Sequence, residues 1–154
     1  MAGLYFEQFP IGQRFDQEVR QTVTDKDNML FPSLTYNPAA IHIDHEYCKQ
    51  TEFDRPLMNS IFTLGLVIGL SDQDTTYGTT VANLGTSETT FLNPVFSGDT
   101  IWLATTVTDL RCSKSRPGQG IGTFEHLGLN QRGETVCRSL RHSRRSRADV
   151  RSIV

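Results

Sequence analysis

A histidine and an aspartate that follow an Asn-Pro pair are the residues of this chain best suited to acid-base chemistry. Asn37 and Pro38 are followed by His42 and Asp44. Pro38 excludes a regular helix across the segment, so these polar side chains are predicted to lie on a bent, ordered loop. Residues two apart in extended backbone point the same way. His42 and Asp44 would then share one side of a cleft, where an imidazole can exchange a proton with a substrate.

Each of these candidates also has a structural interpretation that the sequence leaves open. Asp44 can be the N-cap of a helix over about 45–52, and capping would occupy its carboxylate oxygens. Asn37 can be a turn residue before proline. His42 can be a loop histidine without a role in chemistry.

A long apolar segment after this loop predicts the helix that supports it. Residues 56–70 are apolar almost all the way round and open with a proline at a first-turn position, which predicts a helix buried on most sides. Gly65 and Gly69 each cost about 1 kcal/mol in a helix relative to alanine, so we expect another backbone to approach them closely. Before the loop, residues 14–24 predict a strand, and Thr24 is a candidate N-cap for a helix over about 26–33.

The second half of the chain changes to the pattern of strands. Four segments are rich in Thr, Val, Ile, Leu and Phe and are separated by turns that contain Pro, Gly or Asn. They are residues 79–91, 100–110, 120–130 and 135–142. A strand, then helices, then an antiparallel meander indicate an α+β fold, with a sheet wrapping the apolar helix.

Composition sets limits on location and partners. The 154 residues have a net charge of -2, so one neutral globular domain is expected, with no general attraction to nucleic acid. Cys48, Cys112 and Cys137 form neither a CxxC pair nor a metal-ligand cluster, which indicates reduced thiols in the cytoplasm. No signal peptide and no apolar run of about 18 residues is present, so neither export nor a membrane is expected.

The last residues form a basic cluster. Residues 138–154 hold six arginines and one aspartate. Because apolar residues are sparse there, we expect a domain over 1–143 and a flexible, solvated tail over 144–154. Contact with phosphate or nucleic acid is the alternative for these arginines.

Several short blocks occur in the order found in one known family. They are Tyr5-Phe6-Glu7, residues 34–38, His42-Ile43-Asp44, Asn83-Leu84-Gly85, and residues 93–100, 113–117 and 130–134. Over about residues 4–142 the chain resembles the MaoC-like hydratases and dehydratases of the hot-dog fold, and especially their mesaconyl-CoA hydratase-like branch. The resemblance implies a curled antiparallel sheet around a long central helix, at least a homodimer joined at the sheet edges, and no metal or redox cofactor. It also implies reversible hydration of a 2-enoyl-CoA thioester.

The chain departs from the motif of the common R-specific hydratases, Asp-x-Asn-Pro-x-His. Aligned on Asn37-Pro38, the aspartate position holds Thr35, and His42 lies two residues further on. A threonine cannot replace the carboxylate base. The resemblance therefore assigns catalysis to His42, with Asp44 as its carboxylate partner and Asn37 orienting water or substrate.

The resemblance also suggests where the thioester and CoA would bind. Asn59 and Ser60 stand where family members often carry His-Gly, so the start of the central helix would supply amide donors to the thioester oxygen. Arg111, Lys114 and Arg116 surround a turn and could contact CoA phosphates, or could simply be a solvated hairpin tip. His126 alternates with Phe124 and is expected to be a sheet histidine.

Two other functions remain open on the same fold. The missing aspartate at position 35 suits a non-catalytic protein that binds acyl-CoA or acyl carrier. Other hot-dog enzymes hydrolyse thioesters with a carboxylate near the central helix, a role that Glu52 or Asp54 would take here.

Overall fold

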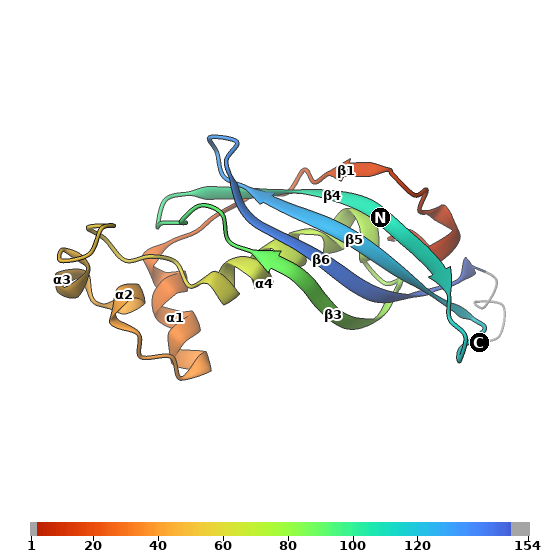
Figure 1. The fold of residues 1–154 in the computed structure, drawn as a ribbon, viewed down its shortest axis with the longest axis horizontal. Coiled ribbons are helices and arrows are strands. Elements are labelled where there is room, and N and C mark those ends of the chain that lie inside the picture. Colours follow the sequence, from red (N-terminus) through yellow and green to blue (C-terminus); the bar gives the residue numbers. More distant parts are fainter. Residues whose placement is uncertain (1–2, 149–154) are drawn as a thin grey trace.

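A curled antiparallel sheet with one helix in its curve forms the body of the molecule (Figure 1). The computed structural model describes residues 3–148, apart from the side chains of residues 73 and 74. The strands are β1 Arg14–Asp16, β2 Gln21–Thr22, β3 Thr80–Thr90, β4 Thr100–Cys112, β5 Gln119–Leu129 and β6 Thr135–Ser146. Their order is β1-β4-β5-β6-β3, and β2 also pairs with β4. The predicted α+β architecture and its four main strands are confirmed.

The predicted strand over residues 14–24 is divided into two short strands. Both pair with β4, so this segment still lies where a strand was expected. At the opposite edge of the sheet, β3 pairs with β6, and its other side is unpaired among the residues that the structure describes. The pairing of β3 with β6 shifts register three times, and these irregularities bend the strand.

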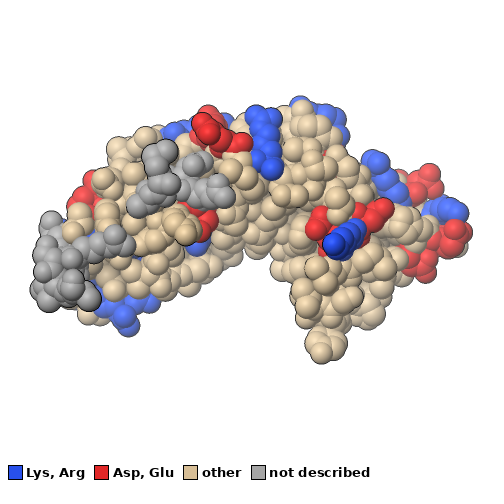
Figure 2. Space-filling view, turned by 180° about the vertical axis from the view of Figure 1, so that it is seen from behind, with Lys and Arg blue, Asp and Glu red and all other residues tan. Residues whose placement is uncertain are grey.

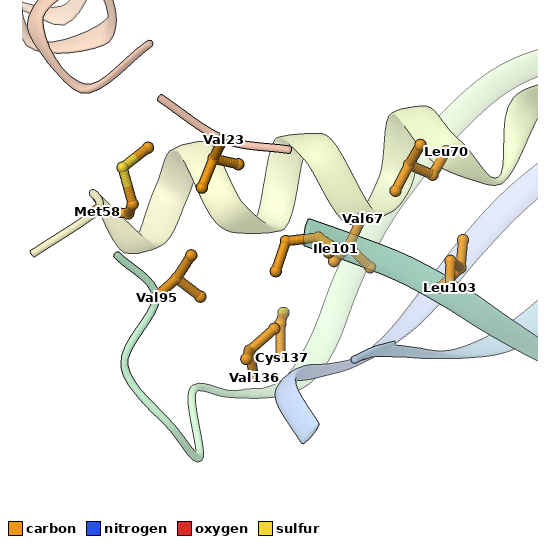
Figure 3. Packing of buried hydrophobic residues seen from close by; sticks show 9 residues of the cluster. All are labelled: Val23, Met58, Val67, Leu70, Val95, Ile101, Leu103, Val136 and Cys137. Atoms are coloured by element: carbon orange, nitrogen blue, oxygen red, sulfur yellow. The ribbon is translucent and has the colours of Figure 1, made fainter. Parts of the chain in front are cut away.

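The central helix, α4, runs over Ser60–Leu70 and is shorter than predicted. Pro56 lies outside it, because residues 57 and 58 pair with residues 96 and 95 in an extended conformation. Its inner face packs on side chains from the sheet and its connections (Figure 3). This core contains Val23, Met58, Val67, Leu70, Val95, Ile101, Leu103, Val136 and Cys137.

The outer face of α4 is open in the single chain, so the prediction of burial on most sides is wrong. Ile61 is 58% exposed, and a Cβ built at Gly65 or Gly69 meets no atom within 4 Å. Among residues 3–148, no backbone outside the helix therefore approaches these glycines closely. The sheet curves around one side of the helix and leaves the other side uncovered.

The remaining helices form a lobe beside the start of α4 (Figure 1). They are α1 Asp25–Thr35, α2 Ala40–Ile43 and α3 His45–Cys48. The predicted helix over 26–33 is present and slightly longer, whereas the one over 45–52 is a single turn. A 3-10 turn at Phe6–Gln8 and a π-helical turn at Asp72–Thr76 complete the elements. None of the helices within the described residues is long and apolar enough to cross a membrane.

Strand β6 extends through Ser146, so the predicted boundary at residue 143 is wrong. Arg145 is 1% exposed, lies over the rings of Phe9 and Phe124, and donates to Thr80 Oγ1. Alternate residues of a strand face the core, so some arginines of this segment are buried although the composition suggested a solvated tail. Residues 149–154 of the predicted tail lie outside the described residues.

Three other arginines of this cluster, all within the described residues, also have partners in the chain. Arg141 is buried and donates to Ser71 Oγ at 3.2 Å, while Arg138 pairs with Glu125 at 2.7 Å. Arg147 pairs with Glu7 at 2.6 Å. The guanidinium groups of these three arginines therefore already have partners in the chain, which does not favour a phosphate-binding surface here.

Candidate active site

His42 lies in the helical turn α2, where its ring is anchored by a backbone carbonyl. Its Nδ1 lies 2.7 Å from the carbonyl oxygen of Leu57, and the side chain is half-buried. A carbonyl oxygen only accepts hydrogen bonds, so Nδ1 must carry the hydrogen. The neutral ring then has its lone pair on Nε2, the arrangement that a general base requires.

Asp44 is the N-cap of α3 rather than the partner of His42. Its Oδ1 accepts hydrogen bonds from the amides of Glu46 at 2.9 Å and Tyr47 at 3.0 Å. The extended segment expected between residues 42 and 44 is replaced by two helical turns that meet at Asp44. Because the Leu57 carbonyl occupies His42 Nδ1, the capping interpretation agrees with the geometry and the predicted pairing does not.

Asn37 forms a turn and also borders the site. Its Oδ1 accepts the Ala39 amide at 3.1 Å, as expected for an asparagine at a proline turn. Thr35, which occupies the position of the absent aspartate, donates its hydroxyl to the Phe31 carbonyl at 2.9 Å. The Thr35 hydroxyl is thus committed to its own helix.

The two residues predicted to bind the oxyanion, Asn59 and Ser60, have different roles at the start of α4. Asn59 is 4% exposed and caps the helix, with its Oδ1 accepting the amides of Ile61 at 2.9 Å and Phe62 at 3.4 Å. Ser60 is the first helical residue and its side chain is exposed. Amides in the first turn have no partner within the helix, so the Ser60 N–H is the donor that remains for an anionic oxygen.

Two cavities lie on either side of this first turn. The sheet-side cavity, about 250 Å³, lies between the turn and the β3–β4 connection. Its lining is Phe53, Leu57, Met58, Ser60, Thr63, Phe91, Leu92, Asn93, Pro94, Val95 and Val136. The α1-side cavity, about 190 Å³, is lined by Phe31, Thr35, Asn37, Asn59 and Ile61. The sequence-predicted residues Asn37, Asn59 and Ser60 therefore border space around one helix terminus.

A wider hollow separates the helical lobe from the body of the molecule. Figure 2 shows it from behind as a notch whose visible walls are mostly uncoloured, with a group of acidic and basic side chains on the lobe close to its edge. A third cavity of about 360 Å³ lies against α1 and includes Tyr36, which is 93% exposed. The lobe thus presents concave, largely uncharged surfaces.

The proposed phosphate contacts lie far from His42 within one chain. Arg111, Lys114 and Arg116 are exposed at the β4–β5 hairpin, at the end of the sheet opposite to the helical lobe (Figure 1). The turn predicted there is confirmed. The three residues do not form one site with the His42 of their own chain.

The carboxylates considered for thioester hydrolysis do not border the cavities. Glu52 and Asp54 are exposed in the loop after α3, whereas His42 is half-buried; none of the three lines any of the cavities described above. His126 is a sheet histidine, as expected, with Nδ1 2.9 Å from Thr105 Oγ1. Burial lowers the pKa of His126 to about 3, with Arg141 and Arg145 acting in the same direction, so its ring is neutral near pH 7.

Asn28, on α1, was not singled out by the sequence analysis. It is 2% exposed, and its side chain bonds to the backbone of His42, Leu57 and Asn59. A polar amide at an inward position of a helix was the only sequence signal, and its partners lie 14 to 31 residues away.

Comparison with known proteins shows which family has this architecture. A sequence model of the MaoC-like domain matches residues 6–127. The mesaconyl-CoA hydratase of Cereibacter sphaeroides is 30% identical over 88% of this chain and 39% of its own length. This chain spans about two fifths of the length of the curated relatives that it matches.

Solved structures agree with that comparison. A MaoC-like dehydratase from Rhodospirillum rubrum is 30% identical, with a TM-score of 0.82 over 94% of this chain and 98% of that one. A Mycobacterium tuberculosis protein described as a double hotdog fold has a TM-score of 0.85 over 96% of this chain and 46% of that one, at 22% identity. The latter supports the fold alone. Because the family model spans residues 6–127, from the first 3-10 turn into β5, this chain belongs to the MaoC-like domain family.

Proposed function

We propose that this protein is a hydro-lyase that reversibly adds water to the double bond of a 2-enoyl-CoA thioester. The observation that carries the proposal is the anchored ring of His42, whose Nδ1 is held by Leu57 just before the start of α4. Membership of the MaoC-like family and similarity to a mesaconyl-CoA hydratase support the same reaction class.

The reaction divides among the residues around the first turn of α4. His42 Nε2 removes a proton from water, whose oxygen bonds to C3 of the substrate as the C2–C3 double bond opens. The electron pair moves to the thioester oxygen, where the Ser60 N–H and the positive helix end stabilise the enolate. The His42 imidazolium then returns a proton to C2, which completes the 3-hydroxyacyl-CoA. In this scheme Asn37 orients the water.

A single histidine serves both proton transfers in this scheme. Thr35 cannot act as a carboxylate, and its hydroxyl is bonded to Phe31. Asp44 is occupied as an N-cap. His42 is therefore the group among the predicted catalytic residues that has a ring nitrogen able both to accept and to donate a proton.

The functional unit that we propose is a homodimer joined along the open β3 edge. Val81, Leu84 and Phe91 are each more than 40% exposed, and Ile61 on the open face of α4 is 58% exposed. An unpaired apolar edge favours pairing with a second strand. A second copy would also cover Ile61 and Gly65.

This dimer would supply the phosphate contacts that one chain lacks at its own site. Antiparallel pairing of two β3 strands reverses the second copy, so its β4–β5 hairpin would lie at the helical end of the first. The partner's Arg111, Lys114 and Arg116 would then approach a CoA bound near His42. Guanidinium and ammonium groups form strong charge-assisted bonds with phosphate.

An absorbance assay tests the proposal directly. Purified protein is mixed with mesaconyl-CoA, crotonyl-CoA and longer 2-enoyl-CoA thioesters while the enoyl absorbance and the free thiol are followed separately. Loss of absorbance without thiol release is expected. Thiol release would instead support a thioesterase, and binding of acyl-CoA without turnover across the series would support a non-catalytic binding protein.

A further inference from the structure

Asn28 joins three segments that meet at the proposed site. Its Nδ2 donates to the carbonyl oxygens of His42 at 2.6 Å and Leu57 at 3.0 Å, and its Oδ1 accepts the Asn59 amide at 3.1 Å. The side chain is buried in α1, so these bonds are shielded from water. One amide thus connects the turn of the proposed base, the carbonyl that holds its ring, and the cap of α4.

The three partners determine which side chain can stand at this position. Two backbone carbonyls require two donors, and one backbone amide requires an acceptor. The asparagine carboxamide supplies both in one plane, and its orientation follows from these partners alone. Aspartate lacks the two donors, and leucine lacks all three polar contacts.

The Leu57 carbonyl is the point at which Asn28 acts on the His42 ring. This oxygen accepts from both Asn28 Nδ2 and His42 Nδ1, and the Met58 N–H of the same peptide group donates to the Val95 carbonyl at 2.9 Å. Its direction is therefore set from two sides. If the carbonyl turned away, Nδ1 would lose the acceptor that selects its protonated tautomer.

We propose that Asn28 is a positioning residue that keeps His42 in the Nδ1–H tautomer and sets the separation between its Nε2 and the first turn of α4. This inference rests on the proposed hydration chemistry for its effect on rate, but not for its effect on the ring. Displacement of a reacting group by about 1 Å can lower a rate by about 100-fold, so a residue that never touches substrate can control turnover.

The substitution Asn28→Asp tests the role with little change in volume. We expect kcat to fall about 10- to 100-fold, with a smaller change in KM. Burial between two carbonyl oxygens raises the pKa of the introduced carboxyl, and only its protonated form can donate. The activity of the variant relative to the original protein should therefore recover partly as pH is lowered through that pKa.

Asn130→Asp is the matched control. Asn130 is also fully buried, and it also makes three side-chain hydrogen bonds, but to residues 132 and 134 in the β5–β6 turn. We expect this variant to lose thermal stability while its kcat and pH profile stay within about twofold of the original. An equal loss of kcat in both variants at matched stability would overturn the positioning role.

Nitrogen NMR of 15N-histidine-labelled protein separates this inference from the proposed function. The His42 signals, assigned by their loss in His42→Gln, should show protonated Nδ1 in the original protein and a mixed tautomer in Asn28→Asp. Unchanged His42 tautomer in a folded Asn28 variant would overturn the inference, whether or not the protein hydrates any thioester. If Asn28→Asp does not fold, Asn28→Ser, which keeps one donor and one acceptor, is judged by the same signals.

Discussion

The helical lobe and the inner face of the sheet each hold a histidine bound through Nδ1, yet only one is suited to chemistry. In the lobe, His42 is half-buried and bonds to the carbonyl of Leu57, a residue that lines the sheet-side cavity. On the sheet, His126 is 2% exposed, bonds to Thr105 and lies near two buried arginines. Burial and positive charge keep the second ring neutral. The difference shows that access and local charge, rather than residue type, separate a proton carrier from a packing residue.

Removing the His42 imidazole should lower kcat more than any other change considered. If kcat did not fall, the contrast between His42 and His126 would be wrong. His42→Gln keeps an amide donor for the Leu57 carbonyl but has no titrating nitrogen. We expect kcat for enoyl-CoA hydration to fall about 100- to 10,000-fold, with the melting temperature nearly unchanged. The neighbouring His45, which is exposed on α3, provides the control, and His45→Gln should keep full activity. Equal rates for the two variants would exclude His42 as the base.

Acid sensitivity should reside in the sheet histidine. The pKa of His126 is lowered from 6.5 to about 3 on folding, so the unfolded chain binds the proton more tightly between these values. The stability contributed by the neutral ring is present above about pH 6.5. It should be lost as pH falls towards 3, with a slope approaching about 1.4 kcal/mol per pH unit.

Urea unfolding of the original protein and of His126→Gln across this range measures that contribution. The unfolding free energy of the variant should depend less steeply on pH, by the slope that corresponds to uptake of about one proton on unfolding. A variant curve parallel to the original would show that other groups cause the acid loss, because His126 is then not the ring that must be protonated on unfolding.

The proposed dimer, in which a second copy covers the open face of α4 beside the lobe, can be tested separately. Ile61→Glu places a charge on the open face of α4, which costs little in a monomer but much inside a dimer interface. We expect the variant to sediment as a monomer and to lose activity. Ile11 serves as control because it is 63% exposed and lies just before β1, at the edge of the sheet opposite to β3. Ile11→Glu should remain dimeric. A dimer that survives Ile61→Glu would place the interface elsewhere.

The smallest effect is expected at Asp44. Asparagine is an equally good N-cap, so Asp44→Asn should preserve both stability and kcat, while Asp44→Ala should cost about 1 kcal/mol of stability. Chemical unfolding and the hydration assay measure the two effects. A large loss of kcat in Asp44→Asn would restore the carboxylate partner that the sequence suggested.

Local patterns were sufficient for much of the fold. Alternation and turn residues located the four long strands, and Pro38 located the break before His42. Both interpretations of Asp44 were available from sequence, but choosing between them required the two amides that its carboxylate reaches. The arginines of β6 were placed wrongly, because composition does not show that Phe9 and Phe124 would cover Arg145.

By itself, the sequence determined the elements, the family resemblance and the candidate histidine, since these depend on residue types a few positions apart. Only the tertiary structure decided that Leu57 holds the ring of His42, that Asn28 joins three segments, and that the outer face of α4 stays open. The physical reason is distance along the chain. Hydrogen bonds between residues 14 to 31 positions apart, and the curvature of a sheet, arise from packing that no local propensity encodes.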